Sequence, residues 1–185
     1  MTVLAPDLPL TMLYGGARPD LLREETLGDI LRATAKRLPN KTALHLIGTA
    51  ERLTYAELDA RSDMIAAALA ARGVKRGEFV GLWFTRPLDL HVAMIGLAKS
   101  GAAFIPFDAD APADRISVSL DDCGARFLLS HAALAPETAK VTVEVLDFHT
   151  LLATPSHASV TEPTTPDHPA YAIYTSGSTG KPKGI

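Results

Sequence analysis

Residues 79–106, FVGLWFTRPLDLHVAMIGLAKSGAAFIP, contain two short apolar runs separated by a helical pattern. The first run, Phe79 to Phe84, is nearly continuous and has the length of a strand, which is typical of a parallel strand covered on both faces. Pro87 suits the first turn of a helix that ends at Gly101, and the run from Ala103 to Pro106 reads as a second strand. This order of strand, helix and strand predicts a right-handed crossover between two parallel strands.

The same alternation continues toward the C-terminus. Residues 113–122 predict a helix that closes at Gly124, residues 125–130 predict a strand, and residues 141–148 predict one more. Strands and helices that alternate in this way form a sheet with helices packed on its faces. We therefore predict an α/β fold built in layers around a parallel sheet.

Two helices and a hairpin are expected before the first of these strands. Thr26 has a suitable position to cap one helix, and Thr54 and Glu57 have the spacing of a capping box at the start of the other. Two short β-prone runs, residues 42–47 and 53–55, lie between the two helical patterns and predict an antiparallel pair.

The two ends of the chain differ from its middle. Residues 1–24 contain proline and glycine and show no stable period, so we expect an irregular lead-in. Residues 154–169 are polar and rich in proline, which predicts a surface loop. The apolar pattern at residues 171–174 predicts a buried strand after that loop. We therefore assign residues 25–185 to one domain rather than to two domains joined by a linker.

Composition argues against several classes of protein. The 185 residues carry a formal net charge of −3 with both signs mixed, which disfavours a nucleic-acid partner. A single cysteine, Cys123, leaves no intrachain disulfide, and the six histidines lack metal-ligand spacing, so no metal site is predicted. The longest apolar run, residues 64–71, is too short for a membrane span, and the first residues lack the basic start of a secretory signal. We expect a cytoplasmic protein with no membrane partner.

Residues 170–184, AYAIYTSGSTGKPKG, have the composition of a phosphate-binding loop placed after a strand. Glycines let the backbone turn its N–H groups toward an anion, hydroxyls add donors, and lysines add positive charge. The candidate binding residues are Thr175, Ser176, Gly177, Ser178, Thr179, Gly180, Lys181, Lys183 and Gly184.

Two common nucleotide-binding motifs do not fit these residues. A Walker loop needs a longer glycine spacing and a Ser or Thr after its lysine, whereas Pro182 follows Lys181 here. No strand in the chain is followed by the glycine pattern of a dinucleotide-binding fold. A Gly/Ser-rich tail with solvated lysines is the remaining alternative that the residues leave open.

The stretch YTSGSTGKPKG resembles the phosphate-binding signature of the adenylate-forming enzymes, a superfamily that includes acyl-CoA synthetases, luciferases and the adenylation domains of non-ribosomal peptide synthetases. Two further stretches resemble family motifs in the same order, LTYAEL at residues 53–58 and LAKSGAAFIPFD at residues 97–108. The second has the form found in peptide-synthetase adenylation domains, although Ala109 and Ala111 stand where that group usually has a proline and an aromatic residue. Similarly, Phe104 stands where a tyrosine is common.

The resemblance implies the fold, the activity and the cofactors. It implies that residues 25–185 are the N-terminal part of the large domain of an adenylate-forming enzyme. Such an enzyme uses ATP and Mg²⁺ to convert a carboxylate, here an amino acid, into an acyl-adenylate and pyrophosphate. The acyl group then passes to the phosphopantetheine thiol of a carrier domain. Of the two lysines, the resemblance favours Lys183, because the P-K-G ending is the more constant part of the family pattern.

In this family the remaining site residues and the mobile C-terminal domain follow the phosphate loop. We therefore expect no complete catalytic set in these 185 residues, and we expect that they do not catalyse adenylation alone. Two alternatives remain open at this point. One is a fragment of an acyl-CoA or aryl-acid ligase, and the other is a stand-alone, non-catalytic nucleotide-binding or interaction module.

Overall fold

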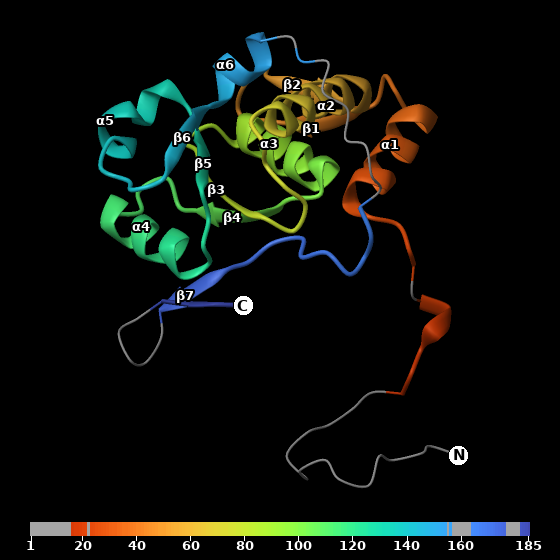
Figure 1. Cartoon of the computed structure of the whole chain (residues 1–185). Helices are drawn as coiled ribbons and strands as arrows, with labels where there is room; N and C mark the ends of the chain where they lie inside the picture. Colours follow the sequence, from red (N-terminus) through yellow and green to blue (C-terminus); the bar gives the residue numbers. More distant parts are fainter. Residues whose placement is uncertain (1–15, 22, 155, 157–163, 177–181) are drawn as a thin grey trace, which may run out of the picture.

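A computed structural model describes residues 16–21, 23–154, 156, 164–176 and 182–185 of the chain (Figure 1). In chain order, the elements are η1 (Pro19–Leu21), α1 (Leu27–Arg37), β1 (Thr42–His45), β2 (Arg52–Thr54), α2 (Tyr55–Ala71), β3 (Phe79–Trp83), α3 (Pro87–Ser100), β4 (Ala103–Phe107), α4 (Ala113–Asp122), β5 (Phe127–Ser130), η2 (Ala132–Leu134), α5 (Ala135–Thr138), β6 (Glu144–Asp147), α6 (Phe148–Ala153), β7 (Tyr174–Ser176) and β8 (Pro182–Gly184).

A four-stranded parallel sheet in the order β4-β3-β5-β6 forms the centre of the fold. β3 pairs along its whole length with β4, from Phe79 opposite Ala103 to Trp83 opposite Phe107. Helices cover both faces of this sheet, as Figure 1 shows, so the predicted layered α/β fold is confirmed. β1 and β2 form the predicted antiparallel pair outside the sheet.

Alternating residues of the strands divide the core into two layers. In β3, Val80 and Leu82 pack in the layer under α2, α3 and α6, whereas Trp83 packs in the layer under α4. Gly81 also faces α4, because a Cβ atom there would lie 2.8 Å from Leu120 Cδ2. A residue without a side chain at this position therefore lets α4 approach the sheet closely.

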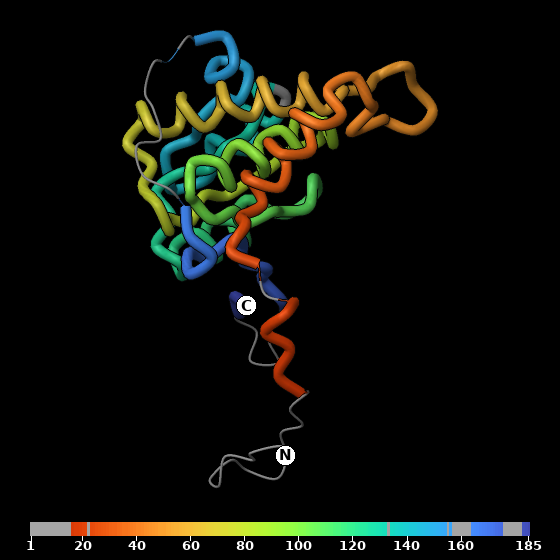
Figure 2. Tube along the Cα trace, turned by 90° about the vertical axis from the view of Figure 1, so that its right-hand side faces the viewer, coloured from red at the N-terminus to blue at the C-terminus, as the bar shows by residue number. Residues whose placement is uncertain are grey.

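The helices on the first face begin and pack as their sequences indicate. Thr26 and Thr54 cap α1 and α2, and each takes part in a capping box. α3 ends at Gly101, which has a φ of 82° and so a left-handed backbone. Figure 2 shows α1, α2 and α3 stacked side by side. α2 and α3 cross closely at Gly96, where a Cβ atom would lie 2.6 Å from Ile65 Cγ2.

Several predicted boundaries were wrong at the far edge of the sheet. β5 begins at Phe127 rather than at residue 125, and β6 covers only Glu144–Asp147. Phe148 does not extend β6, because the Asp147 side chain accepts a hydrogen bond from the Thr150 N–H and caps α6. The sequence reading missed η2, α5 and α6, which are too short to show a helical period.

The predicted buried strand at residues 171–174 was also wrong. Tyr171 and Ile173 are 54% and 50% exposed, and only Ala172 between them is buried. Tyr171 makes a single parallel bridge to Phe104, and the next strand starts at Tyr174. An apolar run shows that a segment has a hydrophobic face, but what covers that face depends on distant parts of the chain.

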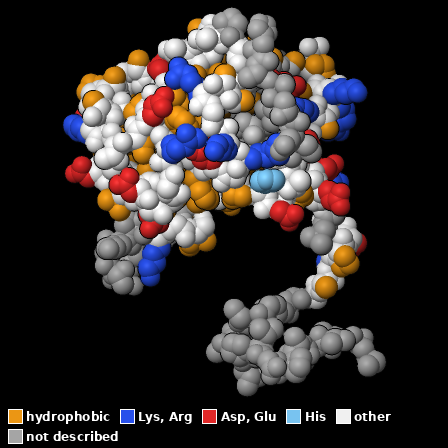
Figure 3. Space-filling view, in the orientation of Figure 1, with side chains coloured by type: hydrophobic (Ala, Val, Ile, Leu, Met, Phe, Trp, Pro, Cys, Tyr) orange, Lys and Arg blue, Asp and Glu red, His pale blue; other side chains and the backbone are white. Residues whose placement is uncertain are grey.

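No helix in the described part of the chain is long and apolar enough to cross a membrane. On the face drawn in Figure 3, Lys and Arg side chains intermingle with Asp and Glu side chains, as expected for a chain of mixed charge.

Candidate functional site

The predicted phosphate-binding stretch includes an antiparallel hairpin made by β7 and β8. Thr175 lies opposite Lys183, and Tyr174 lies opposite Gly184. Beyond this ladder, Ile173 and Ile185 exchange two backbone hydrogen bonds of 3.0 Å. The hairpin therefore holds Thr175 and Lys183, a hydroxyl and an ammonium group, as cross-strand neighbours on one face.

Part of the predicted site lies outside the described residues, namely Gly177, Ser178, Thr179, Gly180 and Lys181. The backbone of Ser176 belongs to β7, opposite Pro182. The Thr175 and Lys183 side chains are exposed, and no described residue forms a hydrogen bond or an ion pair with the Lys183 ammonium group. The described residues thus leave this cation available to an anionic ligand.

The other face of the hairpin points toward α4. The Tyr174 hydroxyl donates a hydrogen bond of 2.8 Å to Asp122 Oδ2 at the end of that helix. Partial burial, together with this bond to a carboxylate, raises the pKa of Tyr174 well above its usual value. The hydroxyl therefore stays protonated and acts as a donor at neutral pH.

The segment before the hairpin attaches to the edge of the central sheet. The Phe104 N–H donates to the Ala170 carbonyl at 3.2 Å, and the Ala172 N–H donates to the Phe104 carbonyl at 3.0 Å. The Tyr171 ring stacks on the Phe104 ring with 5.8 Å between centroids. These contacts lead the chain from β4 toward α4, and Figure 1 shows the hairpin beside that helix.

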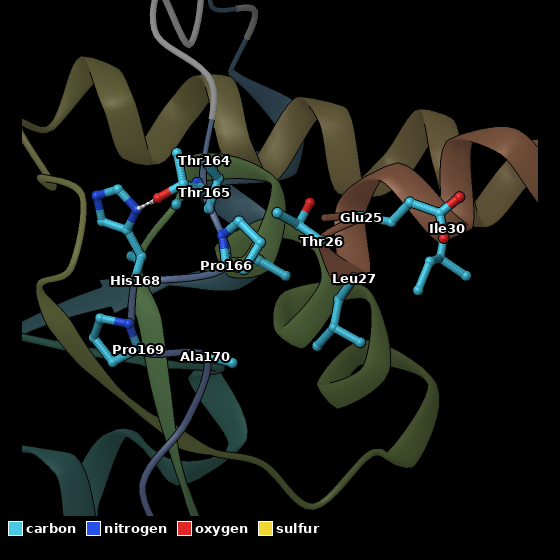
Figure 4. A pocket seen from close by; sticks show the side chains of 13 residues that line it. Glu25, Thr26, Leu27, Ile30, Thr164, Thr165, Pro166, His168, Pro169 and Ala170 are labelled. Atoms are coloured by element: carbon cyan, nitrogen blue, oxygen red, sulfur yellow. Dashed lines mark hydrogen bonds between the residues drawn. The ribbon is translucent and has the colours of Figure 1, made fainter. Parts of the chain in front are cut away.

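A cavity of about 240 Å³ lies between α1, the end of α3 and residues 164–170. Figure 4 shows Leu27 and Ile30 of α1 on one side and Pro166 and Pro169 on the other. His168 lines the same cavity, but its Nδ1 already accepts hydrogen bonds from the N–H and the hydroxyl of Thr165. The lining contains none of the predicted phosphate-binding residues, and sequence reasoning did not predict this cavity.

A second group of polar residues, also not predicted, lies where β3, β5 and β6 end. Ser130, His131 and Asp147 line a cavity of about 330 Å³ there. The Thr85 N–H donates to His131 Nε2 at 3.1 Å, and burial lowers the pKa of His131, which keeps the ring neutral. Their place at the carboxyl ends of neighbouring parallel strands was the signal that could have identified them. The His131 ring also stacks on the Phe84 ring, with 5.7 Å between centroids.

The described ranges of the chain contain no cluster of metal ligands. Among the residues that the structure describes, no group of three or more His, Cys, Asp or Glu side chains could hold a metal ion. Cys123 is half-buried at the end of α4, and burial raises the pKa of its thiol, which disfavours the thiolate form needed for metal binding.

Comparison with known proteins agrees with the motifs and the fold. Delta-poly-L-ornithine synthetase of Acinetobacter baumannii is 44% identical over 181 residues, which are 94% of this chain and 13% of that protein. An artificially fused adenylation-PCP di-domain NRPS of Klebsiella oxytoca, NpsA-ThdA, matches with a TM-score of 0.77 and 29% identity over 89% of this chain and 33% of that one. O-succinylbenzoate coenzyme A synthetase of Bacillus subtilis in complex with AMP matches with a TM-score of 0.74 and 25% identity over 88% of this chain and 42% of that one.

The chain thus spans less than half of the length of each of these relatives. The sequence pattern of the AMP-binding enzymes matches residues 31–185, which include the hairpin and the whole central sheet. On this evidence the chain belongs to the AMP-binding enzyme family.

Proposed function

We propose that residues 25–185 form the N-terminal part of an adenylation domain that activates an amino acid as its acyl-adenylate. The observation that carries this proposal is the hairpin, which holds an exposed Thr175 beside an exposed Lys183 within the family match. In this proposal the hairpin and residues 177–181 between its strands bind the β- and γ-phosphates of ATP. The acyl group then passes to the phosphopantetheine thiol of a carrier domain.

The described residues of the loop have distinct roles in this proposal. Lys183 supplies positive charge to the phosphate oxygens, and Thr175 supplies a hydroxyl donor on the same face of the hairpin. Gly184 permits close packing at the base of the loop. Catalysis in reactions at phosphorus comes mainly from such positioning and charge neutralisation, so these residues orient the leaving pyrophosphate. We assign the same binding role to Ser176 and to Gly177, Ser178, Thr179, Gly180 and Lys181.

Magnesium has no dedicated ligand set among the described residues, which contain no suitable group of three acidic, histidine or cysteine side chains. Mg²⁺ that accompanies a nucleotide would need only one or two protein carboxylates besides the phosphates and water, and so no cluster of three protein ligands. We therefore propose Mg²⁺ as a companion of the nucleotide and assign no described residue of this chain to it.

An acyl-CoA or aryl-acid ligase is the second candidate, because a coenzyme A synthetase is among the structural relatives. The adenylation-PCP protein has the higher identity and TM-score of the two, and it supports transfer to a carrier domain. ATP–pyrophosphate exchange by the adenylation domain that contains these residues would separate the two. Exchange that depends on an amino acid supports our proposal, whereas exchange that depends on an aryl acid, followed by transfer to coenzyme A, supports the alternative.

The ATP-binding role is tested by calorimetric titration of the chain with ATP. We expect Lys183→Ala to weaken ATP binding about tenfold, because the variant removes one charge-assisted contact to a phosphate. Lys140→Ala is the matched control, since Lys140 pairs with Glu137 on a different part of the surface. Absence of ATP binding by the wild-type chain, or an equal loss in both variants, would contradict the proposal.

A further inference from the structure

The two faces of the β7–β8 hairpin carry different side chains and point in different directions. Side chains of neighbouring residues in a strand point to opposite sides, so Tyr174 and Thr175 face opposite ways. Thr175 and Lys183 form one cross-strand pair, and Tyr174 and Gly184 form the adjacent pair on the other face. The face with Tyr174 is directed to α4, because its hydroxyl reaches Asp122. The charged face therefore points away from α4.

The hydrogen bond between Tyr174 and Asp122 joins parts of the chain that are 52 residues apart. The Tyr174 side chain also interacts with the Cys123 thiol, which directly follows Asp122 at the end of α4. The backbone contacts with Phe104 end at Ala172, before the hairpin begins. The Tyr174 side chain is thus held at the end of α4, and its hydrogen bond to the Asp122 carboxylate ties the hairpin to that helix.

Gly184 lacks a side chain at the point where the Tyr174 ring lies against the partner strand. A Cβ atom at position 184 would lie 3.0 Å from Cζ of Tyr174 and 3.2 Å from its hydroxyl oxygen. A side chain there would push the phenol ring away from its position over the partner strand and so away from Asp122. The backbone at Gly184 and the carboxylate of Asp122 therefore hold the Tyr174 ring from two sides.

We propose that Asp122 is a positioning residue for the phosphate-binding hairpin, acting through the hydroxyl of Tyr174. This inference rests on the proposed ATP-binding role of the hairpin. Asp122 does not contact the nucleotide, because it lies on the face opposite Thr175 and Lys183. Its effect is to hold the orientation of the strand that carries Lys183, so that the ammonium group is placed before ATP arrives.

The experiment compares Asp122→Ala, Asp122→Asn and Tyr174→Phe by two measurements on the chain. The first is hydrogen exchange of the amides of Ile173 and Ile185, which pair at the base of the hairpin and need no nucleotide. The second is the dissociation constant for ATP. We expect faster exchange and about fivefold weaker ATP binding in Asp122→Ala and Tyr174→Phe. Asp122→Asn keeps an oxygen acceptor and should stay within about twofold of the wild type.

Two control variants match these changes in chemistry. Asp121→Ala also removes a carboxylate from the end of α4, but Asp121 accepts from the Thr142 hydroxyl at 3.4 Å instead. Tyr171→Phe removes a hydroxyl for which no described residue is a partner and leaves the ring to stack on Phe104. Both controls should keep the exchange rates and the ATP affinity of the wild type.

The outcomes separate this inference from the proposed function. Unchanged hydrogen exchange in Asp122→Ala overturns the inference, whatever the dissociation constant for ATP is. Faster exchange with unchanged ATP affinity, while Lys183→Ala binds more weakly, also overturns it and leaves the proposed function standing. If neither the wild type nor any variant binds ATP, both the proposed function and the ATP role of Asp122 fail. If Asp122→Asn shows the same fast exchange and weak ATP binding as Asp122→Ala, the hydrogen bond is not what positions the hairpin.

Discussion

Lys99 offers the clearest test of how the helices around the sheet are held together. Its side chain is fully buried, and its ammonium group donates to Asp59 Oδ1 at 2.6 Å, to the Asp59 carbonyl at 2.8 Å and to Asp63 Oδ1 at 2.8 Å. The two carboxylates are not buried, because the Asp59 and Asp63 side chains are 27% and 50% exposed. The charge on α3 is therefore desolvated, while its partners on α2 remain in reach of water.

This asymmetry predicts unequal costs for removing the two sides of the cluster. Lys99→Met removes the buried charge, keeps a straight side chain and leaves carboxylates that water can solvate. We expect it to change the free energy of unfolding by less than about 1 kcal/mol. The double variant Asp59→Asn/Asp63→Asn leaves the buried ammonium group without a counter-charge. We expect it to lower the free energy of unfolding by about 3 kcal/mol.

Urea unfolding followed by the fluorescence of the single tryptophan, Trp83, measures both variants in the same assay. Arg32→Met is the control, because Arg32 contacts Asp63 at 3.5 Å across an exposed pair, and its loss should cost at most about 0.5 kcal/mol. A loss of stability in Lys99→Met as large as that in the double variant would refute the reasoning, since the buried charge would then be a net source of stability.

Two further predictions concern the packing of α3 and the pH dependence of stability. Gly96→Ala should lower the free energy of unfolding by about 1–2 kcal/mol, because its Cβ would lie 2.6 Å from Ile65 Cγ2. A higher midpoint temperature of thermal unfolding in this variant would instead show that α2 moves aside easily. Burial lowers the pKa of His131 in the folded state, so the unfolded chain, with a pKa of about 6.5, takes up the proton first as the pH falls. Stability should therefore drop as the pH falls through about 6.5 in the wild type, and it should drop less steeply in His131→Gln. Equal slopes of the urea midpoint against pH in the two proteins would contradict this assignment.

Local patterns predicted the parts of the structure that depend on near neighbours. The capping box of Thr54 and Glu57 begins α2, and Gly101 ends α3 with a left-handed backbone. The apolar run at β3 predicted a strand covered on both sides, and its residues are buried in two layers. Each of these features is determined within a few residues of the chain, where backbone sterics and short-range hydrogen bonds act.

The candidate site was predicted only in its residue types. The run of hydroxyls, glycines and lysines indicated a phosphate-binding loop, but the pairing of Thr175 with Lys183 follows from the register of β7 and β8. The partner of Tyr174 could not be predicted, because Asp122 lies 52 residues earlier and no local pattern connects the two.

The amino-acid sequence was thus sufficient for the alternation of the longer strands and helices and for the start of α2 and the end of α3, and it predicted a phosphate-binding loop. Tertiary structure decided which residues are buried and which meet. The apolar Tyr171 and Ile173 are exposed, whereas the charged Lys99 is buried between helices. Burial and long-range contact depend on how distant segments pack against one another, and this packing free energy is a property of the whole fold rather than of any short stretch of chain.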